Sequence, residues 1–221
     1  MNDYIPTART KVRRLAKRAS YDRLAVHAIL DEGFVCHVGF ALDAQPYVIP
    51  TIYARAGDTL YLHGSAASRM LRTLTQAVPV CITVTLLDGL VLARSAFHHS
   101  LNYRSVVVIG NARLVDEREE KMRALHWITN HVVPRRWEEV RSPSELELKQ
   151  SSVLALPLAE VSAKIRRGPP LDDEEDYALS VWAGVVPVTT RIGTPITDGR
   201  VAAGVPDIDL ARFTRFAPPS A

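Results

Sequence analysis

The residues best suited to bind a ligand lie where a predicted strand, residues 59–63, passes through Gly64 and Ser65 into a predicted helix. The first turn of that helix carries Ser68 and Arg69. Free backbone N–H groups at a helix start, together with a hydroxyl and a fork-shaped guanidinium, suit a phosphate. The structural alternative is that Ser65 and Ser68 cap the helix and that Arg69 is an ordinary surface charge.

The histidines offer a second kind of chemistry. His63 lies beside the turn, and its imidazole can exchange a proton near neutral pH, so we expect it to be the catalytic residue. A hydrogen bond from His63 to the turn is an equally good interpretation. His98 and His99, close to Asn102, form a polar cluster that either lines a pocket or holds iron or haem. We favour a third interpretation, a polar hairpin at the rim of the fold.

The elements that position these residues are mainly strands. Runs rich in Val, Ile, Tyr and Phe, separated by turn-like residues, predict strands at 34–42, 47–54, 59–63, 80–87, 90–98 continuing into 103–115, 153–158 and 160–166. Helical periodicity predicts helices at 23–32, from 65 or 68 to 77, at 117–133, and a short one after 142. This order favours a six- to seven-stranded antiparallel β-barrel with peripheral helices.

Composition places the chain among ordinary globular proteins, with 221 residues, 47% of them hydrophobic and 23% charged. No apolar run reaches the about 20 residues that cross a bilayer, and no secretory signal is present, so we expect a cytoplasmic protein without membrane contact. Cys36 and Cys81 lie in apolar runs and are predicted to be core thiols. Because the common metal-binding motifs are absent, we predict no metal site.

Charge and proline content together divide the chain into three parts. Residues 1–21 form a basic N-terminal arm, residues 22–167 the barrel, and residues 168–221 an irregular extension rich in proline. A basic arm can bind nucleic acid. Here an acidic block at residues 172–176 balances the arm, so we do not expect a nucleic-acid partner.

Three segments resemble the FMN-binding split β-barrel family related to pyridoxamine 5'-phosphate oxidase, in particular its nitroimidazole-resistance-like branch. They are the strand 47–52, the strand-turn-helix 60–69, and the strand 104–110. The resemblance implies a split barrel that binds FMN between the two subunits of a homodimer. The cofactor-binding residues that it implies are Ile49, Pro50, Thr51, His63, Gly64, Ser65, Ser68, Arg69, Asn102, Ser105 and Trp182.

Within that resemblance, the main chain at Ile49–Thr51 contacts the flavin ring, and Ser68 and Arg69 contact the phosphate. The resemblance also implies that the extension from residue 168 reaches the neighbouring subunit, where Trp182 covers the flavin. Met70 replaces a second phosphate-binding Lys of the oxidases, and Ser105 replaces a Gln.

The C-terminal Arg-Leu-His-Asp-Arg substrate motif of the oxidases is absent from the sequence. The chain is therefore predicted to be a flavin-dependent oxidoreductase acting on another small molecule, not a true pyridoxamine phosphate oxidase.

Three other functions stay open. A flavin carrier without turnover needs no catalytic side chain, and a flavin-linked transcriptional regulator would use the basic arm to bind DNA. A haem-handling split barrel is the least favoured. We expect its histidine ligand near the C-terminal end, and the last histidine of this chain is His131.

Overall fold

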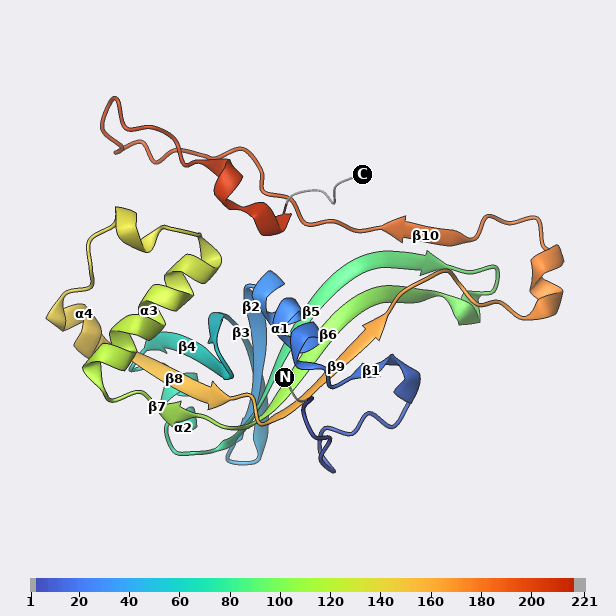
Figure 1. Ribbon diagram of the computed structural model, residues 1–221, viewed down its shortest axis with the longest axis horizontal. Coiled ribbons are helices and arrows are strands. Elements are labelled where there is room, and N and C mark those ends of the chain that lie inside the picture. The colour runs from blue at the N-terminus through green and yellow to red at the C-terminus, as the bar shows by residue number, and fades with distance from the viewer. Residues whose placement is uncertain (1–2, 217–221) are drawn as a thin grey trace.

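The computed structural model describes residues 3–216 of the chain. It is mainly β, and its ten strands form one antiparallel sheet in the order β1-β9-β6-β5-β2-β3-β4-β8-β7, with β10 paired to β5 (Figure 1). The strands are β1 (Ala19–Ser20), β2 (Val35–Leu42), β3 (Gln45–Ala56), β4 (Thr59–Ser65), β5 (Pro79–Leu92), β6 (Ser100–Asn111), β7 (Arg113–Leu114), β8 (Ser151–Pro157), β9 (Glu160–Arg166) and β10 (Gly184–Pro187).

Four α-helices and six 3₁₀ turns connect or cover these strands. The α-helices are α1 (Arg23–Glu32), α2 (Arg69–Leu74), α3 (Arg118–Val132) and α4 (Glu145–Gln150). The 3₁₀ turns are η1 (Ala16–Arg18), η2 (Ala96–His98), η3 (Trp137–Glu139), η4 (Glu174–Ala178), η5 (Leu210–Arg212) and η6 (Thr214–Phe216). Among the residues that the structure describes, no helix is both long and apolar enough to cross a membrane.

The sheet curls into a split barrel because one continuous stretch of chain forms β6, near one end of the strand order, and then β7, at the other end. β6 pairs with β5 and β9, whereas β7, which follows β6 after Ala112, pairs with β8. The predicted antiparallel, mainly β fold is confirmed, but the number of strands is ten rather than six or seven, and the described strands form no closed ring. The difference arises from β1 and β7, which have two residues each, and from β10 in the tail.

Helix α1 lies against the barrel and contributes its apolar side to the core. Asp22 caps it by accepting hydrogen bonds from the backbone N–H groups of Leu24 and Ala25. Val26, Ile29 and Leu30 are buried, as the helical periodicity predicts. A second apolar cluster lies on the other face of β3, β4 and β8, where α3 packs with Ala124 and Ile128.

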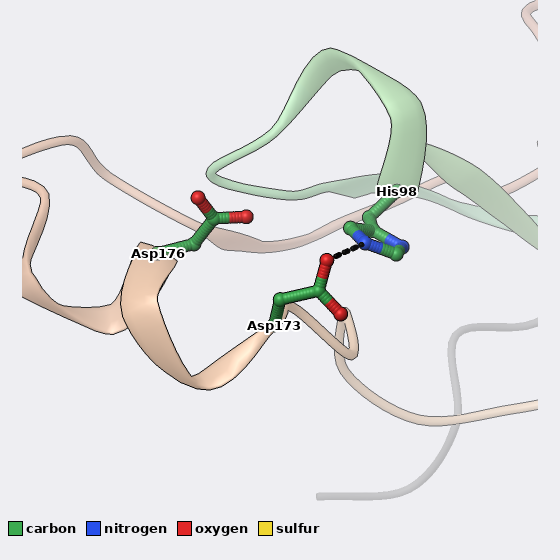
Figure 2. Close-up of side chains that lie close together, drawn as sticks. All are labelled: His98, Asp173 and Asp176. Carbon is green, nitrogen blue, oxygen red and sulfur yellow. Dashed lines mark hydrogen bonds and ion pairs between the residues drawn. The ribbon is translucent and has the colours of Figure 1, made fainter.

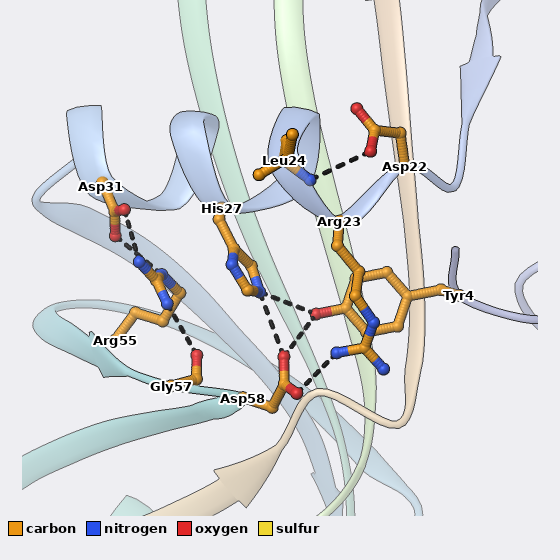
Figure 3. A network of polar contacts seen from close by, with 9 residues as sticks. All are labelled: Tyr4, Asp22, Arg23, Leu24, His27, Asp31, Arg55, Gly57 and Asp58. Atoms are coloured by element: carbon orange, nitrogen blue, oxygen red, sulfur yellow. Dashed lines mark hydrogen bonds and ion pairs between the residues drawn. The ribbon is translucent and has the colours of Figure 1, made fainter. Parts of the chain in front are cut away.

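The basic N-terminal segment folds onto the barrel. β1 pairs with β9, and Tyr4, which is buried, joins a polar network with His27 and Asp58 (Figure 3). The Tyr4 hydroxyl lies 3.0 Å from His27 Nε2 and donates to Asp58 Oδ1 at 3.1 Å. Arg23 lies over the Tyr4 ring and pairs with Asp58 at 2.5 Å. These contacts fix the start of the arm to α1 and to the β3–β4 turn.

The C-terminal extension contacts the rest of the chain at several places. Asp172 accepts hydrogen bonds from Arg94, β10 pairs with the end of β5, and Arg212 forms an ion pair with Glu139. Between these contacts the chain runs along the outside of the barrel (Figure 1). As far as residue 216, the extension is irregular apart from β10 and its 3₁₀ turns, as its proline content predicts.

The two cysteines differ in environment. Cys36 is fully buried, as predicted. The prediction of a core thiol is wrong for Cys81, which is exposed. Cys81 lies on β5 between the buried residues Val80 and Ile82, and alternate residues of a strand point to opposite faces. The apolar run around Cys81 therefore predicts that Cys81 lies in a strand, but it does not predict on which face of the sheet the Cys81 side chain lies.

Candidate functional site

The first part of β3 has one edge without a strand partner. Residues 45–52 pair with β2, whereas β4 pairs only with residues 53–56. No other described strand pairs with β3, and because backbone groups of successive residues point to alternate sides of a strand, every second residue of this segment has groups free at that edge to bind a ligand. Pro50 has no N–H group, which fits its place on an edge. The structure thus allows main-chain contacts within the predicted segment Ile49–Thr51.

The start of α2 lies beside that free edge. The guanidinium carbon of Arg69 lies 5.0 Å from the centre of the Tyr47 ring, and Tyr47 belongs to β3. Next to this contact is a pocket of about 350 Å³, lined by Leu42, Ala67, Arg69, Arg72, Thr73 and Gln76. Within residues 3–216, neither Arg69 nor Arg72 has an acidic partner. Two cations three residues apart on a helix make this pocket attractive to an anion.

The serines of the turn have structural roles. Ser68 caps α2, with its Oγ accepting a hydrogen bond from the Leu71 N–H at 3.1 Å. Ser65 Oγ accepts one from the Ala67 N–H at 3.2 Å. The structure therefore shows the cap interpretation for Ser68, whereas Ser65 stabilises the turn that precedes the helix. Each hydroxyl can still donate its proton to a ligand.

Packing explains two further features of the turn. A side chain at Gly64 would place its Cβ 3.1 Å from the Leu71 side chain, so this glycine lets β4 and α2 approach closely. Met70 is buried in the core and points away from the pocket. The second cation of the pocket is Arg72, which lies about one helical turn after Arg69.

His63 lies on β4, in register with Val153 of β8. It follows Leu62, which is buried in the barrel, so its ring is on the opposite face, the face that α3 covers. Nδ1 of His63 is buried, with no hydrogen-bond partner among the described residues. Burial lowers the pKa of His63, which keeps the imidazole neutral at neutral pH. A neutral imidazole carries its proton on one ring nitrogen, so the other nitrogen has a lone pair available to an iron or to a donor group.

Asn102 and Ser105 have partners of their own on β6. The Asn102 side chain donates to the Gly168 carbonyl at 3.1 Å and accepts from the buried Arg166. It thus fastens the start of the C-terminal extension to the barrel. Ser105 donates to the Lys164 carbonyl on the neighbouring strand at 3.3 Å. Neither contact involves the free edge of β3.

Trp182 stands apart from the other predicted site residues. It lies on the extension just before β10, and its ring packs over Gly184, whose Cβ would approach it to 2.9 Å. The side chain is 63% exposed in the single chain. The contact of Trp182 with a neighbouring subunit therefore stays a prediction about an assembly.

Three residues at or beside this pocket were not among the ligand-binding residues expected from the sequence: Tyr47, Thr73 and Gln76. The spacing of Arg69, Arg72, Thr73 and Gln76 at three or four residues was the available signal, because it places all four on one side of a helix.

A larger pocket of about 720 Å³ lies between the barrel and the end of the extension. At its wall Arg104 is paired with Glu32 and Asp88, and these hydrogen bonds hold its pKa above the usual range. Arg104 is thus neutralised inside the chain, unlike Arg69 and Arg72.

Several known proteins resemble the chain. The flavocytochrome Anf3 from Azotobacter vinelandii is 40% identical, and the match covers 97% of this chain and 99% of that one with a TM-score of 0.89. The FAD and heme binding protein from Mycobacterium smegmatis is 36% identical, covering 88% of this chain and 96% of that one with a TM-score of 0.84.

A putative 5-nitroimidazole antibiotic resistance protein from Bacteroides thetaiotaomicron is 26% identical, with a TM-score of 0.57 over 66% of this chain and 86% of that one. A search of the curated proteins finds no match. The sequence profile of the family described as pyridoxamine 5'-phosphate oxidase matches residues 22–165, most of the chain. The chain therefore belongs to the pyridoxamine 5'-phosphate oxidase family.

Proposed function

We propose that the chain is a redox protein that binds a flavin and a haem. The observation that carries the flavin is the free edge of β3 next to a pocket with two unneutralised arginines. The flavin ring would lie along the edge at Ile49–Thr51, with its phosphate between Arg69 and Arg72. Polar atoms of the backbone then bind the ring, and the two guanidinium groups bind the charge.

The flavin that we propose is FAD, although the family resemblance implies FMN. The support is the relative from M. smegmatis, which is 36% identical and is named for FAD. FMN and FAD share the phosphate attached to the ribityl chain, so Arg69 and Arg72 serve either flavin. The adenylate half of FAD adds apolar surface and a second phosphate, which need further contacts.

A specific observation also favours the haem. Two relatives that match most of this chain are named as a flavocytochrome and as an FAD and heme binding protein. His63 offers a half-buried, neutral imidazole with an unpartnered nitrogen, which suits an iron ligand. The sequence led us to expect a haem ligand near the C-terminal end, and we propose instead that the ligand is on β4. His63 is then an iron ligand rather than an acid or base.

The two groups together indicate oxidoreductase chemistry. A bound flavin exchanges electrons in pairs or singly and a haem exchanges them singly, so the pair can pass electrons from a two-electron donor to a one-electron acceptor. We propose that the protein works as a homodimer, because Trp182 and the tail are exposed in the single chain. The reacting partner is a small molecule.

The flavin part is tested by titrating the purified apoprotein with FAD, FMN and riboflavin while following flavin fluorescence. Arg69→Ala and Arg72→Ala should each weaken FAD and FMN binding about ten- to hundredfold, the range for losing a hydrogen bond to a charged group. Riboflavin binding should stay unchanged, because riboflavin has no phosphate. Arg123→Ala is the control, since Arg123 is exposed on α3. Equal losses for all three flavins, or no loss for FAD, would remove the phosphate site.

A further inference from the structure

Three side chains with metal-binding atoms converge where the β5–β6 hairpin meets the C-terminal extension. They are His98, from η2 at the hairpin tip, and Asp173 and Asp176, from the acidic block (Figure 2). His98 Nε2 lies 3.2 Å from Asp173 Oδ2, and the three ligand atoms all lie within 4.8 Å of one another. Small side-chain rotations would bring one nitrogen and two oxygens to about 3 to 3.5 Å apart, the separation of ligands on one ion.

The local structure holds the two carboxylates on the same side. Asp173 directly precedes the 3₁₀ turn η4, and the Asp176 N–H donates to the Asp173 carbonyl at 2.9 Å. Asp173 lies just before the turn with an extended backbone, three residues from Asp176, and the carboxylates of both come within 4.8 Å of the His98 imidazole.

Separate contacts fix the turn to the hairpin. Asp172 accepts from the Arg94 backbone N–H at 2.9 Å and pairs with the Arg94 guanidinium at 3.1 Å. That guanidinium also lies 4.8 Å from the centre of the Tyr177 ring. None of these contacts uses His98, Asp173 or Asp176. The scaffold is therefore in place without occupying the three candidate ligands.

The charge at this place is negative and uncompensated. Among the described residues, neither Asp173 nor Asp176 has a Lys or Arg partner, and Glu174 and Glu175 add two more carboxylates next to them. Arg94 is engaged by Asp172. Carboxylates that face the same point repel each other, and a bound cation would relieve that repulsion.

We propose that His98, Asp173 and Asp176 bind a divalent transition-metal ion, with Zn²⁺ the best match. An imidazole nitrogen with two carboxylates suits Zn²⁺ better than Mg²⁺ or Ca²⁺, which prefer oxygen ligands alone. Water would complete the coordination, since Asp173 is largely exposed. The ion would join the hairpin tip to the extension and so hold the route of the tail along β5. The site is separate from His63, which lies on β4.

The test is a calorimetric titration of the full, untagged chain with Zn²⁺. We expect one ion per chain, and at least about tenfold weaker binding in His98→Gln and Asp176→Asn. His99→Gln and Glu175→Gln are matched controls, because each removes a neighbouring group of the same chemistry outside the cluster. His99 Nδ1 lies against the Ser95 carbonyl instead. His63→Gln should bind Zn²⁺ at this place as the parent does, which separates the metal from the proposed haem.

A second readout follows the tail itself. Trypsin cleavage at Arg191 and Arg200 should slow when Zn²⁺ is added to the parent protein, and EDTA should reverse the protection. Asp176→Asn, an exchange near the surface, should keep the melting temperature of the metal-free parent and lose the Zn²⁺-dependent protection. A parent that binds no Zn²⁺, or variants that bind it as tightly as the controls, would overturn the proposal.

Discussion

His63 and Arg69 lie on either side of the turn between β4 and α2, and each suits a different ligand. The Arg69 guanidinium is exposed beside Tyr47 and faces a pocket shared with Arg72. His63 is half-buried on the far side of β4, and its Nδ1 has no partner among the described residues. A charged group in water and a neutral group in an apolar setting suit a phosphate and a metal centre respectively.

Burial also makes His63 and His131 a source of pH-dependent stability. Burial lowers the pKa of both in the folded protein, so the unfolded chain binds more protons below pH about 6.5. The free energy of unfolding should therefore fall as the pH decreases from 7.5 to 5.5, above the range where carboxylates titrate. Urea unfolding at the two pH values measures it. The double variant His63→Gln/His131→Gln should show a smaller fall, and an equal fall would contradict this account.

Part of the candidate site could be proposed from the sequence for a clear physical reason. Ser68 and Arg69 could be found because a strand, a glycine turn and a helix start are local patterns. The roles of Asn102 and Trp182 depend on where residues 166–184 run, and no local pattern specifies a path over the surface. Helical periodicity also predicted that Met70, Leu71 and Leu74 form the buried side of α2, and all three are buried.

At the scale of elements, periodicity predicted the long strands and helices. β2, β3 and α1 have enough residues for an alternating or helical pattern to emerge. The predicted strands 80–87 and 90–98 differ from the structure, in which β5 runs without a break from Pro79 to Leu92. β1, β7 and β10 are too short to show a pattern. They become strands only because β9, β8 and β5 offer them hydrogen-bonding edges.

The junction between α1 and β2 provides a test of the fold. The Tyr53 hydroxyl, fully buried, lies 2.6 Å from the Leu30 carbonyl and 3.0 Å from the Gly33 carbonyl. Tyr53→Phe removes this donor and leaves a buried carbonyl with one partner fewer. The protein should lose about 1–3 kcal/mol of unfolding free energy, measured by urea denaturation. Tyr177→Phe is the control, since its hydroxyl has no hydrogen bond among residues 3–216, and a similar loss there would contradict the assignment.

At the scale of the whole molecule, part of the outer face of the sheet, over β2, β3 and β5, is left uncovered. Val35 is 40%, Val48 68% and Leu87 42% exposed on neighbouring strands. Cys81 is also exposed on β5, the strand of Leu87. Phe97 and Ile196, at the hairpin tip and on the tail, are almost fully exposed. Exposed apolar groups on this scale indicate a surface that another molecule covers. A second copy of the chain fits the proposal of a homodimer.

The dimer should be visible in two measurements. Light scattering should give about twice the 24.5 kDa of the chain at micromolar concentration. Labelling of Cys81 by a thiol reagent should be slow in the dimer and faster on dilution, whereas Cys36 should react only after unfolding. A monomer at micromolar concentration, or Cys81 labelling that is fast at every concentration, would contradict the proposed assembly.

The most direct test of the account is the absorption spectrum of the protein purified and reconstituted with FAD and haem, before and after His63→Gly. We expect flavin bands and a Soret band in the parent. His63→Gly should lose or shift the Soret band and keep the flavin bands, and added imidazole should restore the Soret band by taking the place of the missing ring. His126→Gln, at a half-exposed position on α3, is the control. A parent protein with neither flavin nor Soret bands after reconstitution would contradict the central claim, and a Soret band unchanged in His63→Gly would remove His63 as the ligand.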